Sequence, residues 1–135
     1  LFRSIKHLQT FHDEALDALN GDIDAWQRVG LTDKPFPSPP YMGLEGIHPI
    51  ANAIDLFKEG REMRHCIAAY CDQVHSRTFF AYKVTAPVRA TLSVVRNKAG
   101  EWVPGEAAGF ANQPIPVELA TMLFHALFAT RVHGQ

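Results

Sequence analysis

The chain has 135 residues, of which 47% are hydrophobic and 20% charged, and its formal net charge is -1 at pH 7. This length fits one compact domain, and the composition is typical of a globular protein with a packed core. Proteins that hold nucleic acid mainly through its phosphates carry a large positive excess, so the net charge excludes strong non-specific binding of that kind.

No apolar run approaches the roughly 20 residues needed to span a bilayer, so we expect no membrane insertion. No basic segment with an apolar core follows Leu1, and we expect a cytoplasmic protein, either trimmed or cut from a larger chain. Cys66 and Cys71 would diverge around a helix, so a disulfide between them would fit poorly and a reducing compartment is expected.

The N-terminal part is predicted to be helical. Apolar residues at spacings of three and four predict an amphipathic helix over 3–19, and a short helix over 22–29 follows it. Four prolines in the stretch 31–43 predict an extended loop, because proline lacks an amide donor and fixes one torsion. We expect Phe36 and Tyr41 to pin this loop to the core.

Two further helices are predicted in the middle of the chain. The first covers 47–57, with Pro49 near its first turn, where the missing N–H does least harm. The second covers 59–74, either as a separate helix or as a continuation past Gly60.

The C-terminal half is predicted to hold three strands and a helix. Runs rich in β-branched and aromatic residues over 78–84, 89–96 and 101–110 are separated by short turn sequences, which favours antiparallel hairpins. A last helix follows Pro116. The predicted fold is α+β in a single domain of residues 1–135, with N-terminal helices, a three-stranded antiparallel β-meander and a C-terminal helix.

The stretch GREMRHCIAAYC lies on the predicted helix over 59–74. At about 100° per residue, Glu59, Cys66 and Tyr70 share one polar shoulder, while His65 points nearly the opposite way from the buried stripe. Adjacent His65 and Cys66 therefore cannot form a catalytic dyad by themselves on a regular helix. Simpler interpretations remain open. Cys66 could be a small buried hydrophobic residue, His65 a surface or fully hydrogen-bonded histidine, and Tyr70 a core aromatic residue. No C-x2-C or H-x3-H spacing is present, so no metal or cofactor is expected.

The predicted sheet has one polar face. Arg89, Thr91 and Ser93 alternate with apolar residues, and this face is expected to be either a site or a solvated surface. Gly109 and Asn112 follow the last strand, where a structural turn is the default reading and a binding role for Asn112 is the alternative.

Several of these motifs occur together in the PcfJ-like family, which this chain resembles over residues 35–115, with 1–34 as a helical N-terminal extension. The resemblance rests on FPSPPY, LFKEGREMRHCIAAY, RATLSV and GFAN. The residues that match the family pattern are Glu59, Gly60, Met63, His65, Cys66, Tyr70, Arg89, Thr91, Leu92, Gly109 and Asn112. Departures are Ile67, where valine is common, and Glu106, where a glutamine is expected.

The resemblance implies a protein of plasmids, phages or other mobile elements, associated in a conjugation system with the DNA-processing machinery. It implies no settled catalytic activity. It does single out Cys66 and His65 as site candidates.

Two hypotheses follow. In the first, which we favour, the chain is an accessory domain that binds a DNA-processing partner protein or nucleic acid, with Lys83, Arg89 and Arg96 touching phosphates. In the second, it is an enzyme with a site between the 59–74 helix and the sheet, including a toxin or anti-phage effector. Cys66 would then be the nucleophile, His65 the acid or base, and Glu59 and Tyr70 would orient the substrate.

Overall fold

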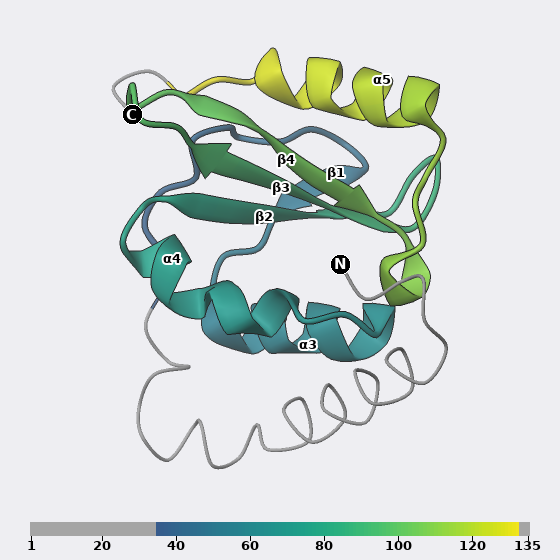
Figure 1. The fold of residues 1–135 in the computed structure, drawn as a ribbon, viewed down its shortest axis with the longest axis horizontal. Helices are drawn as coiled ribbons and strands as arrows, with labels where there is room; N and C mark the ends of the chain where they lie inside the picture. Colours follow the sequence, from purple (N-terminus) through teal and green to yellow (C-terminus); the bar gives the residue numbers. More distant parts are fainter. Residues whose placement is uncertain (1–34, 133–135) are drawn as a thin grey trace.

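The computed structural model describes residues 35–132, so the helices predicted over 3–19 and 22–29 lie outside the described residues. The described elements, labelled as in Figure 1, are β1 (Ile47–Pro49), α3 (Ala53–Met63), η1 (Ile67–Tyr70), α4 (Cys71–His75), β2 (Phe79–Val84), β3 (Ala90–Arg96), β4 (Trp102–Ala108), η2 (Phe110–Asn112) and α5 (Val117–Phe128). This is an α+β fold, as the sequence predicts.

Four strands form one antiparallel sheet in the order β1-β2-β3-β4. The three predicted strands are confirmed as β2, β3 and β4. The fourth strand, β1, lies where a helix is predicted over 47–57, and that prediction is wrong at its start because the helix begins only at Ala53. Pro49 ends β1 opposite Tyr82 of β2. A proline is tolerated there because β1 is a short strand at the edge of the sheet.

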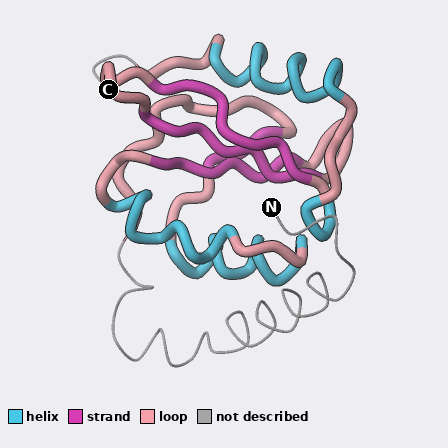
Figure 2. Tube along the Cα trace, viewed as in Figure 1, coloured by secondary structure: helices cyan, strands magenta, loops and turns pink. Residues whose placement is uncertain are grey.

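Helices cover both faces of the sheet (Figures 1 and 2). The segments α3, η1 and α4 lie on one side, and the predicted C-terminal helix, α5, lies on the other. Residues of β2 and β3 alternate between these layers, and the register places Thr91 opposite Lys83 and Ser93 opposite Ala81 on the α3 side. Thr91 and Ser93 are 3% and 5% exposed. The polar sheet face is therefore buried under α3, and the expectation that it could be a solvated surface is wrong.

The helix predicted over 59–74 is broken in the middle. Asn52 caps α3 by accepting a hydrogen bond from the Asp55 N–H at 2.8 Å, and the helix ends at Met63. Arg64 then adopts the left-handed conformation, with φ 56° and ψ 50°. A residue with a Cβ takes up that conformation at an expense of about 1 kcal/mol or more, so tertiary contacts must hold the break in place. The buried side chain of His65, which follows Arg64 directly, makes one such contact, with Thr91.

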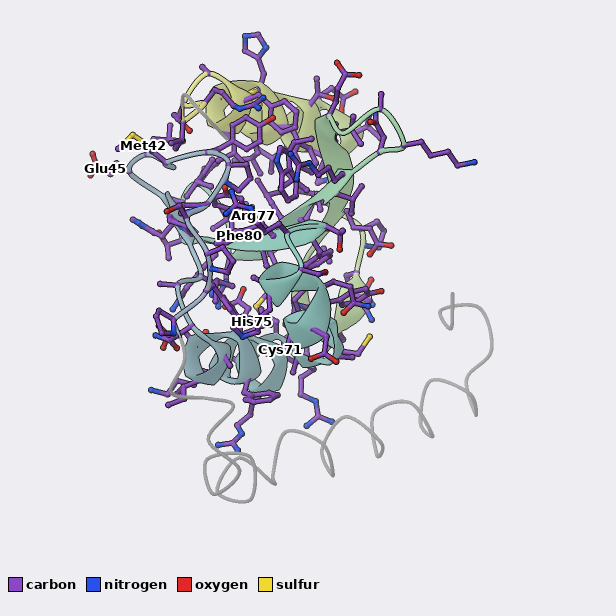
Figure 3. The ribbon with its side chains drawn as sticks, turned by 90° about the vertical axis from the view of Figure 1, so that its left-hand side faces the viewer. Met42, Glu45, Cys71, His75, Arg77 and Phe80 are labelled. Atoms are coloured by element: carbon purple, nitrogen blue, oxygen red, sulfur yellow. The ribbon has the colours of Figure 1, made fainter. Side chains whose placement is uncertain are left out.

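The proline-rich loop is pinned to the core as predicted, because Phe36 and Tyr41 are both buried. The ring of Tyr41 stacks on Phe128 of α5 with centroids 4.4 Å apart. Beyond Tyr41 the loop turns outward, and Met42 and Glu45 project away from the fold (Figure 3). The loop thus connects the sheet to α5.

A β-bulge distorts β4, the strand at the other edge of the sheet. Leu92 pairs with Ala107 and Val94 with Pro104, so Ser93 of β3 faces two residues, Gly105 and Glu106. The Ser93 hydroxyl accepts a hydrogen bond from the Glu106 N–H at 2.9 Å. Bulges and prolines are features that protect sheet edges from pairing with other strands.

We expect Gly105→Ala to lower the free energy of unfolding by about 1–3 kcal/mol, the usual range for overpacking. A Cβ at this position would lie 2.6 Å from Ser93 Oγ and 2.9 Å from the Ser93 backbone oxygen. Ser93 belongs to β3, which is paired on both sides, so its backbone cannot easily move away. Urea denaturation measures the change. The Gly105→Ala/Ser93→Ala double variant should stay destabilised relative to Ser93→Ala alone; full recovery would show that only the hydroxyl clashes.

Candidate functional site

An ion pair between Glu59 of α3 and Arg89, which directly precedes β3, is the centre of the candidate site. The carboxylate of Glu59 is 2% exposed and accepts hydrogen bonds from both terminal nitrogens of Arg89, with Nη1 3.0 Å from Oε2. Arg89 Nη1 also donates to the backbone oxygen of Ala90 at 3.0 Å. This two-pronged geometry is the strong form of an arginine–carboxylate contact.

Glu62, one helical turn after Glu59, accepts a hydrogen bond from Arg89 Nη2. The Arg89 guanidinium lowers the pKa of Glu62, first through this hydrogen bond and then through its charge. Sequence reasoning missed Glu62. The spacing of three residues from Glu59 was the available signal, because residues i and i+3 share a helix face.

Thr91 and His65 extend the network beneath the sheet. The Thr91 hydroxyl donates its proton to Glu59, and it lies 2.9 Å from Nε2 of His65, which is 3% exposed. Because the only hydroxyl proton goes to the carboxylate, Nε2 must be the donor to Thr91. The Nδ1 atom of the neutral ring is then an acceptor, and it receives the Ile67 N–H at 3.4 Å. Every polar atom of this ring is engaged inside the fold.

The prediction that His65 points away from the cluster is wrong. It assumed a continuous helix, but the left-handed residue Arg64 turns the chain and brings the imidazole toward Thr91. Burial lowers the pKa of His65, while the charge of Glu59 acts in the opposite direction. The ring is therefore neutral near pH 7, and both of its nitrogens have partners other than the Cys66 thiol.

Cys66 and Tyr70, which were predicted to share a shoulder with Glu59, belong to a different environment. Cys66 is half-buried, and burial raises the pKa of its thiol, with a further rise from the charge of Glu106 on β4. The ring of Tyr70 stacks on Phe79 with centroids 4.5 Å apart and is 39% exposed. A thiol with a raised pKa is a poor nucleophile, because the thiolate is the reactive species.

The three cations proposed to contact phosphates do not form one surface. Lys83 lies opposite Thr91, with its Nζ 3.9 Å from Glu62 Oε2. Arg96 is at the far end of β3 from Arg89, about 24 Å away at 3.4 Å per residue, where it donates to the Gly100 oxygen and covers the Trp102 ring. Arg89 itself is held by Glu59 and Glu62.

Asn112 has a backbone role in the structure. It ends η2, which packs against α3, and it has a φ of 63° directly after Ala111 at 55°. Asparagine tolerates this left-handed conformation better than most residues. The structure thus gives Asn112 a place in a tight turn, as the default reading of the sequence has it.

The surface of residues 35–132 has hollows beside α3 and beside α5. A cleft of about 270 Å³ lies between the β1–β2 edge and α3; His48, Lys58, Glu62 and Lys83 are among its lining residues. A larger, mainly apolar groove of about 570 Å³ lies between β4 and α5. Its apolar lining residues include Ala107, Ile115, Val117, Ala120, Phe124 and Phe128.

Residues 35–132 contain no group of three or more His, Cys, Asp or Glu side chains placed to hold a metal ion. Within the same residues, no helix is both long and apolar enough to cross a membrane. No protein-family model, curated protein or solved structure matches this chain.

Proposed function

We propose that this chain is a non-catalytic accessory domain of a plasmid, phage or other mobile-element protein, and that it binds a protein of a DNA-processing complex. The resemblance to the PcfJ-like family supplies the biological setting. One observation carries the proposal: polar residues that match the family pattern bind one another beneath the sheet. These residues are Glu59, His65, Arg89 and Thr91.

This engagement argues against catalysis by the motif. A general base needs a free lone pair within reach of a substrate proton. In His65 the Nε2 proton is donated to Thr91, and the Nδ1 lone pair accepts the Ile67 N–H. The motif supports the fold, so the enzyme hypothesis has no specific observation in its favour.

The same contacts argue against direct binding of DNA or RNA through the predicted cations. Arg89 is neutralised by two carboxylates, and Lys83 lies beside one of them. A phosphate would have to displace Glu59 from Arg89 and leave it buried without its partner, which is strongly unfavourable.

The groove between β4 and α5 supports a protein partner. Its lining is mainly apolar, and Val117, one of the lining residues, is 76% exposed. Pro104 and the bulge in β4 disfavour the addition of a strand from the partner. We therefore assign to the partner a helix or loop that inserts apolar side chains into the groove.

The first test asks whether nucleic acid binds. Fluorescence anisotropy with labelled single-stranded and double-stranded DNA at low salt should show weak binding at most, and Arg89→Ala should not change it. Tight binding that Arg89→Ala abolishes would contradict the proposal.

The second test asks for the protein partner. The DNA-processing proteins encoded on the same mobile element would be purified and titrated against the domain. Val117→Lys should weaken the complex at least tenfold, since a buried charge without a partner opposes binding by about 1.4 kcal/mol or more. Met42→Lys is the matched control, because Met42 is 69% exposed on the 41–46 loop and does not line the groove. Equal binding by both variants would remove the groove from the interface.

A further inference from the structure

The outer side of α5, which faces away from the sheet, is poor in polar residues (Figure 1). The helix has 12 residues, VELATMLFHALF, and its polar side chains are Glu118, Thr121 and His125. All three polar positions except Thr121 carry an ionisable group, and Met122 beside them is 66% exposed. A helix at the surface of a monomer normally has a mainly polar outer face. The outer side of α5 is therefore suited to contact another protein surface.

Glu118 and His125 are spaced so that this side of α5 complements itself. Both are exposed, and they lie seven residues apart, which is close to two helical turns, so they share one side of the helix. When two such helices pack antiparallel about a two-fold axis between positions 121 and 122, Glu118 of each copy faces His125 of the other. A histidine ring donates a hydrogen bond to a carboxylate when it is neutral and adds an opposite charge when it is protonated. A parallel pair would set like residues against each other, so the charges favour the antiparallel pair.

Met122 lies next to the two-fold axis of this pair. The methionines of the two copies therefore meet at the centre, where contact removes their exposed apolar surface from water. The two sheets do not collide, because each lies on the far side of its own α5. The groove beside β4 also stays open: its lining residue Phe124 directly precedes His125 and so lies about 100° around the helix from it.

We propose that the outer side of α5 binds a second copy of the chain, in an antiparallel α5 pair with Glu118 of each copy bonded to His125 of the other. Identical patches related by a two-fold axis are the commonest interface between copies of one protein. This pairing goes beyond the proposed function, because it uses neither the groove nor a DNA-processing protein. A helix of 12 residues is about 18 Å long. The interface is thus smaller than the roughly 1,200 Å² of ordinary specific complexes, and the dimer is weak.

Sedimentation equilibrium of the full 135-residue chain, up to about 1 mM, measures this association. We expect the apparent mass to rise with concentration from that of one 15.0 kDa chain toward twice that value. Met122→Lys should weaken the association about tenfold or more, since two like charges then meet at the axis. Phe110→Lys is the matched control, because Phe110 is 58% exposed on η2, which packs against α3. A mass independent of concentration in the parent, or equal association by both variants, would overturn the proposal.

Mixing two charge variants tests the antiparallel register. Glu118→Lys sets lysine against histidine, and His125→Glu sets carboxylate against carboxylate, so each variant alone should associate several-fold more weakly than the parent. In an equimolar mixture the new lysine of one variant faces the new glutamate of the other, and the second pair keeps its native residues. A fluorescent label on one variant should therefore report a heterodimer at least as tight as the parent dimer.

The outcome of the mixing experiment is decisive in either direction. Recovery in the mixture would support the register and would show that both variants are folded. Weak association in the mixture, with the circular dichroism spectrum of the parent in both variants, would overturn the proposal; if a variant is unfolded, the comparison of Met122→Lys with Phe110→Lys decides. These measurements contain no DNA-processing protein, so a negative result would leave the proposed function as it stands.

Discussion

Arg89→Ala should lower the free energy of unfolding by about 3 kcal/mol, at the low end of the range for breaking a buried ion pair because Arg89 is partly exposed. Among residues 35–132, the substitution leaves the Thr91 hydroxyl as the one remaining donor to the carboxylate of Glu59, which is 2% exposed. A buried charge without its partner is the main source of the loss. For a domain of about 100 residues, each kcal/mol corresponds to a fall in Tm of roughly 4–8 °C.

Glu62→Gln is the matched control for Arg89→Ala. It removes a carboxylate from the same guanidinium, but the Glu62 side chain is 57% exposed, so the change should be within about 1 kcal/mol. Comparable losses in the two variants would contradict the assignment of the buried pair as the dominant contact.

A double-mutant cycle separates the charge from the packing. Glu59→Gln in the Arg89→Ala background should recover part of the lost stability, because the amide carries no buried charge and can still accept from Thr91. If Glu59→Gln brings no recovery, the loss in Arg89→Ala comes from missing side-chain contacts and the missing bond to the Ala90 carbonyl oxygen.

The alternating strands could be predicted from the sequence because their periodicity is local. The stretch RATLSVV places Leu92 and Val94 on one face and Thr91 and Ser93 on the other, and the structure preserves this division. The alternation of residues does not indicate which face of the sheet a helix covers. Thr91 and Ser93 are buried because Glu59 and the Glu106 N–H bond their hydroxyls, and both partners come from other elements.

The strand β1 could not be predicted from the sequence for a related reason. A strand of three residues has too little alternation to be distinguished from a helical turn, and Pro49 fits the first turn of a helix as well as the end of an edge strand. Its pairing with β2 is a long-range contact that local sequence does not encode.

The break at Arg64 determines how the side chains of the candidate site are arranged. The helical periodicity of the sequence gives no sign of this break. With a continuous helix, Cys66 and Tyr70 share a face with Glu59; with the left-handed Arg64, His65 takes that place. Beyond the break, the His65 side chain contacts Thr91, 26 residues away in the sequence, and this contact lies outside any local window. The structure joins Glu59, Arg89, Thr91 and His65, whereas the sequence pattern placed Cys66 and Tyr70 beside Glu59.

Tyr82→Phe should lower the free energy of unfolding by about 2–4 kcal/mol, because it leaves two buried backbone groups without partners. The Tyr82 hydroxyl accepts the Tyr41 N–H at 3.0 Å and donates to the Tyr41 backbone oxygen at 2.8 Å. Tyr82 is fully buried in the sheet, and burial raises the pKa of its hydroxyl, so the group stays protonated and keeps both bonds at ordinary pH.

The loss should spread to α5, since Tyr41 connects the loop to that helix by stacking on Phe128. Amide hydrogen exchange should therefore accelerate in residues 35–46 and in α5 more than in β2 and β3. Tyr70→Phe makes the same chemical change at an exposed ring and should alter stability by no more than about 0.5 kcal/mol. Uniform acceleration over the whole sheet in Tyr82→Phe would mean that the hydroxyl supports the core in general; acceleration confined to the loop and α5 would identify it as the tether between them.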